Sequence, residues 1–140
     1  MRRRDFLAGS IGCTLTVPWL AWGDDSDSQG ERKRIAFLGT VVRRHSHAQH
    51  FLDRLTFGYA WQSQWVAPRV EVASVYIDQY PEDDLARQRI ERHQLDSYPS
   101  IADALTLGGD ELAVDGVVII GEHGDYPRNE WGQLSFLALP

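Results

Sequence analysis

RIAFLGTVVRRHSHAQH, from Arg34 to His50, is the stretch that decides the fold of this chain. It begins with a short apolar run, Ile35 to Leu38, closed by Gly39, which is typical of a strand buried on both faces of a parallel sheet. A polar, histidine-rich turn follows, and apolar residues then recur at helical spacing. Strand, glycine turn and helix predict the opening of a βαβ unit, and ligands of such folds gather at that turn.

Beyond that stretch, helix and strand patterns alternate. The first helix is expected from Ser46, its N-cap, to Tyr59, because one face is apolar. The residues of that face are Ala48, Phe51, Leu52, Leu55 and Tyr59. The later segments are expected to be a loop at 61–69, a strand at 70–77, a helix at 81–93 and a short strand at 98–99. Ser100 and Asp103 are expected to open a further helix, with Ile101, Ala102 and Leu105 inward. The last expected segment is a strand at 114–121.

This alternation predicts an α/β fold, a Rossmann-like parallel sheet with flanking helices. We expect it to span residues 32–133 with about four strands, which is little more than one mononucleotide-binding half. Residues 134–140, LSFLALP, form an apolar tail. No further helix is predicted to cover the sheet, so we interpret the domain as incomplete, with truncation after the tail as one explanation.

The first 23 residues have the features of a twin-arginine signal peptide. Arg3-Arg4-Asp5-Phe6-Leu7 matches the twin-arginine pattern, and Leu7 begins an uncharged stretch of 16 residues that ends at Trp22. Cleavage is expected before Asp24, and 24–31 is expected to be a disordered acidic linker. We therefore expect export by the twin-arginine machinery to the periplasm. The alternatives are an uncleaved anchor or a basic N-terminus on a cytoplasmic protein.

Composition narrows the classes of function. The only cysteine, Cys13, lies in the leader, so the mature part is predicted to have no disulfide and no thiolate site. Of 14 basic and 20 acidic side chains, Arg2–Arg4 and Asp5 belong to the leader, which leaves 11 basic and 19 acidic. This acidic balance argues against nucleic acid or an anionic membrane as a partner.

The loops that follow the strands suggest a dinucleotide site. Gly39 and Thr40 form the turn, the helix starting near Ser46 offers free N–H groups to a pyrophosphate, and Asp78 can accept ribose hydroxyls. Arg43 can pair with phosphate. The alternatives are an ordinary strand-end turn at the glycine and an acid that caps the next helix at Asp78.

The same loops carry a possible metal site. His45, His47 and His50 have the donor atoms and the close spacing of zinc or manganese ligands, and an H-x-H pair after a first strand also begins several metal-dependent hydrolases. The alternative is that these are solvated histidines bonded to backbone or water. After the last predicted strand, His123 is a candidate acid or base.

Together these residues resemble the N-terminal domain of the Gfo/Idh/MocA oxidoreductase family. The similar segments are KRIAFLGT at 33–40, VYID at 75–78, YPSIADAL at 98–105 and VDGVVIIGEHGDYP at 114–127. The resemblance implies that NAD or NADP binds at these loops, with Gly39 at the cofactor turn and Asp78 as the ribose-binding acid. Glu122 and His123 would lie near the nicotinamide, where a small polyol or sugar-like substrate would meet it.

The family's Glu-Lys-Pro segment with its catalytic lysine, and its C-terminal domain, have no counterpart up to residue 140. The leading hypothesis is therefore an exported NAD(P)-binding domain of an oxidoreductase with little or no activity alone. One alternative is a metal-binding or metal-dependent hydrolytic domain that uses the three histidines. The other is a non-enzymatic remnant.

Overall fold

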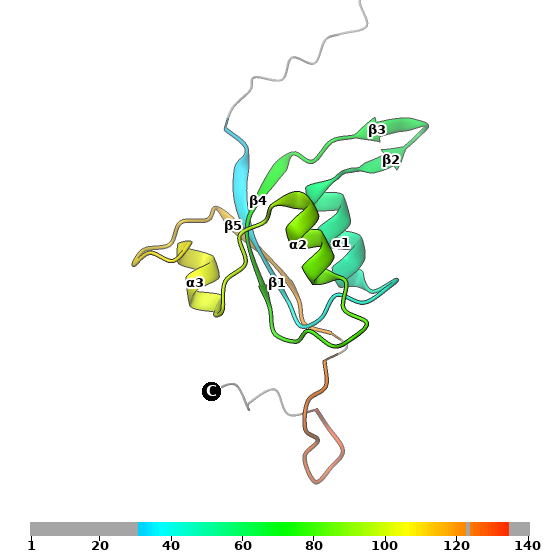
Figure 1. The fold of residues 1–140 in the computed structure, drawn as a ribbon, viewed down its shortest axis with the longest axis vertical. Helices are drawn as coiled ribbons and strands as arrows, with labels where there is room; N and C mark the ends of the chain where they lie inside the picture. The colour runs from blue at the N-terminus through cyan, green and yellow to red at the C-terminus, as the bar shows by residue number, and fades with distance from the viewer. Residues whose placement is uncertain (1–30, 123, 135–140) are drawn as a thin grey trace, which may run out of the picture.

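The computed structural model of this chain describes residues 31–122 and 124–134. The predicted leader, the linker up to residue 30, His123 and residues 135–140 lie outside that part of the chain. A three-stranded parallel sheet with helices on both faces forms the centre of the molecule (Figure 1). This confirms the predicted α/β class and a partial Rossmann-like arrangement.

The sheet has the strand order β4-β1-β5. The central strand β1 (Lys33–Gly39) pairs in parallel with β4 (Val70–Ile77) on one side and with β5 (Gly116–Ile120) on the other. The short strand predicted at 98–99 is reduced to a single parallel bridge between Ser97 and Val75. The chain thus extends the sheet outward from β1 through β4, and then crosses back to the other side of β1.

Two helices cover one face of the sheet, α1 (His47–Thr56) and α2 (Ala86–His93) (Figure 1). Strand side chains alternate between the faces, so every second residue of β1 points toward these helices. Ile35 and Phe37 lie on this side with Leu52 of α1. The buried core of this face is Ile35, Phe37, Val42, Ala48, Leu52, Val72, Val75, Ile77 and Ala86.

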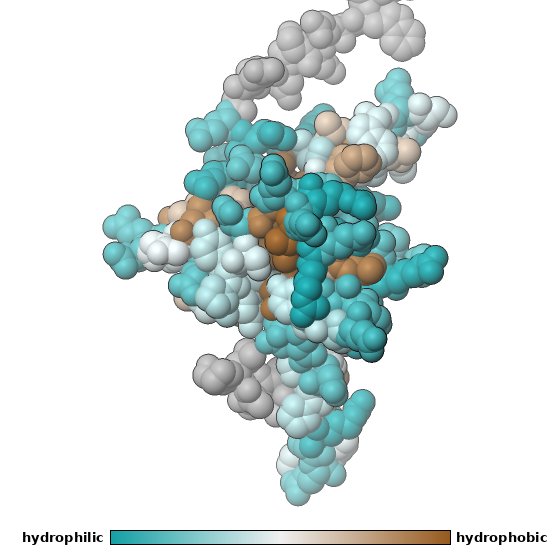
Figure 2. All heavy atoms as spheres, in the orientation of Figure 1, coloured by the Kyte–Doolittle hydropathy of each residue, from teal (hydrophilic) through white to brown (hydrophobic). Residues whose placement is uncertain are grey.

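The opposite face is covered by α3 (Ile101–Thr106) and has a smaller core of Ala36, Leu38, Ala104 and Val114. Val117 and Ile119 of β5 point to this side and are 43% and 69% exposed. In the space-filling view, apolar surface is visible near the middle, between the positions of α3 and α2 in Figure 1 (Figure 2). This face is therefore open along β5.

Helix α1 begins where the sequence predicts, but it ends earlier than Tyr59. The Ser46 hydroxyl accepts a hydrogen bond from the Gln49 N–H, which confirms the N-cap. After Phe57 the chain turns at Gly58, where φ is +100° and a Cβ would collide with the Val66 carbonyl. Only glycine fits this turn, so the helix ends before it.

The predicted loop at 61–69 is wrong, because an antiparallel hairpin forms there. Its strands are β2 (Tyr59–Trp61) and β3 (Gln64–Val66), and the positive φ angles of Gln62 and Ser63 are those of a two-residue type I′ turn. This turn usually carries Asn-Gly or Asp-Gly, so Gln-Ser gives little signal in the sequence.

The two later helices also differ in detail from the prediction. Helix α2 starts at Ala86 rather than at Pro81, because the residues between form a turn. The Ser100 cap of α3 is confirmed, yet Ala104 is the buried residue, while Ile101 and Ala102 are exposed. No second helix packs beside α3 in the described residues, so Ile101 stays at the rim of the open face. None of the described helices is long and apolar enough to cross a bilayer.

Candidate functional site

The candidate site lies at the edge of the sheet where the three parallel strands end. In register, Gly39 of β1 is opposite Ile77 of β4 and Ile120 of β5. Since β1 connects to β4 on one side and the chain then crosses from β4 to β5 on the other side, this edge holds the topological switch point, where open α/β sheets bind ligands. The backbone continues the pairing past the strand ends, because the Thr40 N–H donates to the Ile120 carbonyl at 3.1 Å.

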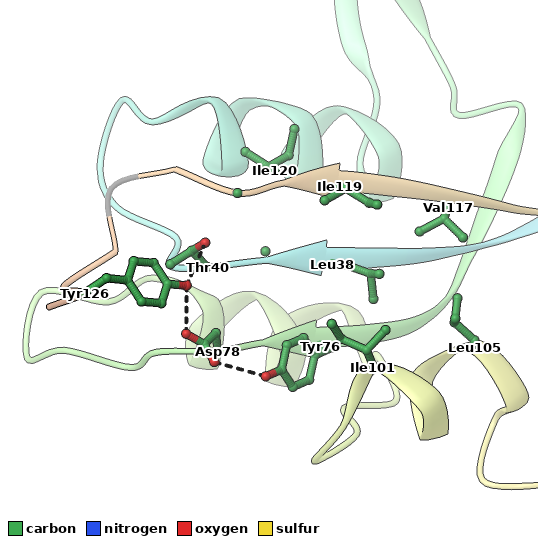
Figure 3. A pocket seen from close by; sticks show the side chains of 12 residues that line it. Leu38, Thr40, Tyr76, Asp78, Ile101, Leu105, Val117, Ile119, Ile120 and Tyr126 are labelled. Carbon is green, nitrogen blue, oxygen red and sulfur yellow. Dashed lines mark hydrogen bonds between the residues drawn. The ribbon is translucent and has the colours of Figure 1, made fainter. Parts of the chain in front are cut away.

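Asp78 is at the centre of a hydrogen-bonded cluster at this edge (Figure 3). The Tyr76 hydroxyl donates to Oδ1 of Asp78 at 3.0 Å, and the Tyr126 hydroxyl donates to Oδ2 at 2.9 Å. The Tyr126 hydroxyl also lies 3.4 Å from Oγ1 of the buried Thr40. Both oxygens of the predicted ribose-binding carboxylate therefore accept phenol hydrogen bonds.

Ionisation of the two tyrosine phenols in this cluster is suppressed. Partial burial is the main cause that raises the pKa of the Tyr76 phenol, and its hydrogen bond to Asp78 raises the pKa further. Burial likewise raises the pKa of Tyr126, with Asp78 adding to the rise and the Thr40 hydroxyl opposing it. At neutral pH both phenols are protonated and can donate to the oxygens of Asp78.

An apolar hollow of about 330 Å³ adjoins this cluster on the open face of the sheet. Side chains of β1, β5 and α3 point into it, and Asp78 and Tyr126 form one rim (Figure 3). Its apolar lining consists of Leu38, Ile101, Leu105, Val117, Ile119 and Ile120, with the ring of Tyr76. A pocket with an apolar wall and a few polar groups at its rim is typical of small-molecule sites.

The N-terminus of α1 faces the same edge, and the chain's own carboxylate lies against it. The His47 backbone N–H donates to Oε1 of Glu122 at 2.9 Å, and the His47 ring Nδ1 is 2.9 Å from Oε2. Unpaired N–H groups and the helix dipole make a helix N-terminus a place for an anion. Glu122 thus takes the position at which a ligand phosphate would bind.

The loop after β5 is tied across the strand ends. The Gln79 side chain receives a hydrogen bond from the Asp125 N–H at 2.8 Å and donates to the Asp125 carbonyl at 3.2 Å. A Cβ at Gly124 would collide with the Tyr126 ring and with Thr40, so the loop lies close against the turn after β1. The described parts of 121–127 therefore cover the switch point.

The remaining predicted cofactor residues lie around this edge. A Cβ at Gly39 would come within 3.0 Å of the Ile77 side chain and 3.2 Å of the Phe37 ring, so the glycine satisfies strand packing. Nε of Arg43 lies 3.5 Å from Oδ1 of Asp83, which directs this guanidinium toward the turn before α2. The structure therefore brings Gly39, Thr40, Asp78 and Glu122 to one edge, whereas His123 lies outside the described residues.

The three histidines of the proposed metal site do not converge on one point. The rings of His45 and His50 are 6.5 Å apart between centroids, and His47 pairs with Glu122. Within residues 31–122 and 124–134, no group of three or more potential ligands is placed to hold a metal ion. The geometry of this part of the chain gives the metal hypothesis no support.

Sequence reasoning missed both tyrosines of the Asp78 cluster. Tyr76 could have been found, because it lies two residues before Asp78 and successive side chains of a strand alternate between faces. Tyr126 is 48 residues from Asp78 in the chain and reaches it from an irregular loop. No local pattern reveals such a contact.

Comparison with known proteins identifies no relative. No family model matches the chain, and neither a curated protein nor a solved structure is significantly similar to it. The resemblance to Gfo/Idh/MocA oxidoreductases therefore stays a prediction from the sequence. Function has to be argued from the geometry of the site.

Proposed function

We propose that this chain is a nucleotide-binding domain of the NAD(P) type, with little or no dehydrogenase activity alone. The observation that carries the proposal is the position of Asp78, which follows the strand next to β1 and has its carboxylate at the switch point. In dinucleotide-binding folds an acid at this place accepts the ribose hydroxyls. The adjoining apolar hollow suits a planar ring.

In the described structure the loop after β5 lies over the edge proposed to bind the nucleotide. A ribose hydroxyl would compete with the Tyr126 hydroxyl for Asp78, and a phosphate would have to displace Glu122 from the N-terminus of α1. Tyr126 and Glu122 both belong to the loop after β5. Binding is therefore expected to move that loop, and the free energy of this movement lowers the apparent affinity.

The test is a titration of the full chain with NADH and with NADPH, followed by energy transfer from tryptophan to the reduced nicotinamide. We expect saturable binding that Asp78→Ala weakens at least about tenfold, because a hydrogen bond to a charged group contributes about 1.5–3 kcal/mol. Asp110→Ala removes an exposed carboxylate far along the chain from the site and is the matched control. Equal affinities for the two variants, or no binding by folded protein, would overturn the proposal.

We also propose that the chain is exported by the twin-arginine route. The support is the Arg3-Arg4-Asp5-Phe6-Leu7 pattern with the uncharged stretch that follows it. A fusion of the full chain to a reporter that is active only outside the cytoplasm tests this. Export that persists when Arg3 and Arg4 are both changed to Lys would contradict it.

A further inference from the structure

The hollow on the open face of the sheet is lined by aliphatic side chains, and no described part of the chain covers them. Ile119 is 69% exposed and Val117 43% exposed, and Ile101 of α3 is exposed across from them. Exposed aliphatic side chains that adjoin one another in this way mark a surface that is covered by something. Within the described part of the chain, Asp78 at one end is the only charged residue that lines the hollow.

The end of the described chain turns back toward this hollow. Arg128 and Leu134 form an antiparallel bridge, and the Asn129 N–H donates to the Gln133 carbonyl at 2.9 Å inside it. Asn129 also accepts hydrogen bonds from the N–H groups of Trp131 and Gln133, which fixes the turn. Because the bridge is antiparallel, the chain leaving Leu134 runs opposite to the chain that enters through Tyr126.

The register of this bridge predicts which residues the next part of the chain would meet. Residues 128 and 134 are opposite each other, so a continued antiparallel register places residue 135 opposite Pro127 and Phe136 opposite Tyr126. Tyr126 lines the hollow. The segment 135–140 is SFLALP, which has no charge and carries Phe136, Leu137 and Leu139. Fully extended, six residues reach about 20 Å, and a five-residue strand such as β5 spans about 16 Å.

We propose that residues 135–140 bind in the hollow and cover Ile119, Val117 and Ile101. A segment joined to the same chain has an effective concentration in the millimolar range, which favours it over a second copy of the protein at ordinary concentrations. The segment then occupies the apolar side of the Asp78 edge. This inference concerns the chain without nucleotide, because the ring of a bound nucleotide would have to displace the segment from the hollow.

Disulfide trapping in the full chain tests this contact directly. Cys13→Ser removes the only native cysteine, and Ile119→Cys with Leu137→Cys then places one thiol on the hollow and one on the segment. The matched control pairs Leu137→Cys with Phe57→Cys, because Phe57 is similarly exposed, at 64%, but lies at the C-terminus of α1. Mild oxidation is followed by mass spectrometry of the linked peptides, in protein shown to be folded by circular dichroism.

We expect the first pair to form an intramolecular disulfide at least about tenfold faster than the control pair, since a disulfide needs the two Cβ atoms within about 4.5 Å. Equal rates would overturn the inference, and so would the absence of a disulfide in the first pair. A covalent dimer as the main product would also overturn it, in favour of a second copy on this face. Val117→Cys in place of Ile119→Cys gives an independent repeat on the same strand.

Discussion

The two faces of the parallel sheet are covered to different extents. On one face α1 and α2 bury Phe37, Leu52 and Val75 completely. On the other, the six-residue α3 and the rest of the described chain leave Ile119 of β5 69% exposed. Stability is therefore concentrated on the face beneath α1 and α2. The open face contributes less to folding and adjoins the Asp78 edge, where a ligand or another segment can bind.

The largest expected effect comes from the covered face. Leu52→Ala removes a completely buried side chain and is expected to lower the free energy of unfolding by about 2–5 kcal/mol. Ile119→Ala, on the open face, is expected to lower it by only about 1 kcal/mol or less, because the described residues leave Ile119 69% exposed and only the proposed segment 135–140 covers it. Urea unfolding of the two variants measures both. Equal losses of unfolding free energy in the two variants would contradict the difference between the faces.

A smaller effect is expected where α3 is attached to the sheet. The Ser74 hydroxyl is fully buried and donates to the Ala104 carbonyl at 2.6 Å. Ser74→Ala leaves that carbonyl without this donor, so we expect a loss of about 1–3 kcal/mol. Thr106→Ala removes an exposed hydroxyl of the same helix and is the control. If both variants have the same urea midpoint, the attachment of α3 does not depend on this bond.

The smallest effect is a change of stability at alkaline pH. The pKa values of Tyr76 and Tyr126 are raised in the folded chain, chiefly by burial. Below about pH 10 both phenols are protonated in the folded and the unfolded chain, and the stabilisation is lost as pH rises through the folded pKa. The urea midpoint should therefore fall above about pH 10, and fall less steeply in Tyr126→Phe than in the exposed control Tyr59→Phe. If the urea midpoints of the two variants fall in parallel as pH rises, Tyr126 is excluded as a cause of the loss of stability at alkaline pH.

The sequence predicted the parts of this fold that depend on local patterns. The buried run before Gly39, the strand at 70–77 and the Ser46 and Ser100 caps all follow from apolar spacing and hydrogen bonding within a few residues. The hairpin at 59–66 was missed, because its turn residues, Gln62 and Ser63, are not those that usually form such turns.

The site was predictable only in part, for a similar reason. Parallel strands bring their carboxyl ends to one edge, so the positions of Gly39, Thr40, Asp78 and Glu122 followed from topology. The hydrogen-bond partners of these residues did not follow from topology. The contacts of Tyr126 with Asp78 and of Glu122 with His47 join residues 48 and 75 positions apart, and they depend on the path of an irregular loop.

We propose that the loop after β5 covers a nucleotide site at the carboxyl edge of the sheet. The most direct measurement compares NADH binding to the full chain with binding to the double variant Glu122→Gln, Tyr126→Phe, by tryptophan-to-nicotinamide energy transfer. The variant loses the negative charge at the α1 N-terminus and the hydroxyl on Asp78, so the account predicts saturable binding at least about tenfold tighter than in the unchanged chain. Weaker binding by the variant, or no binding by either folded protein, would contradict it.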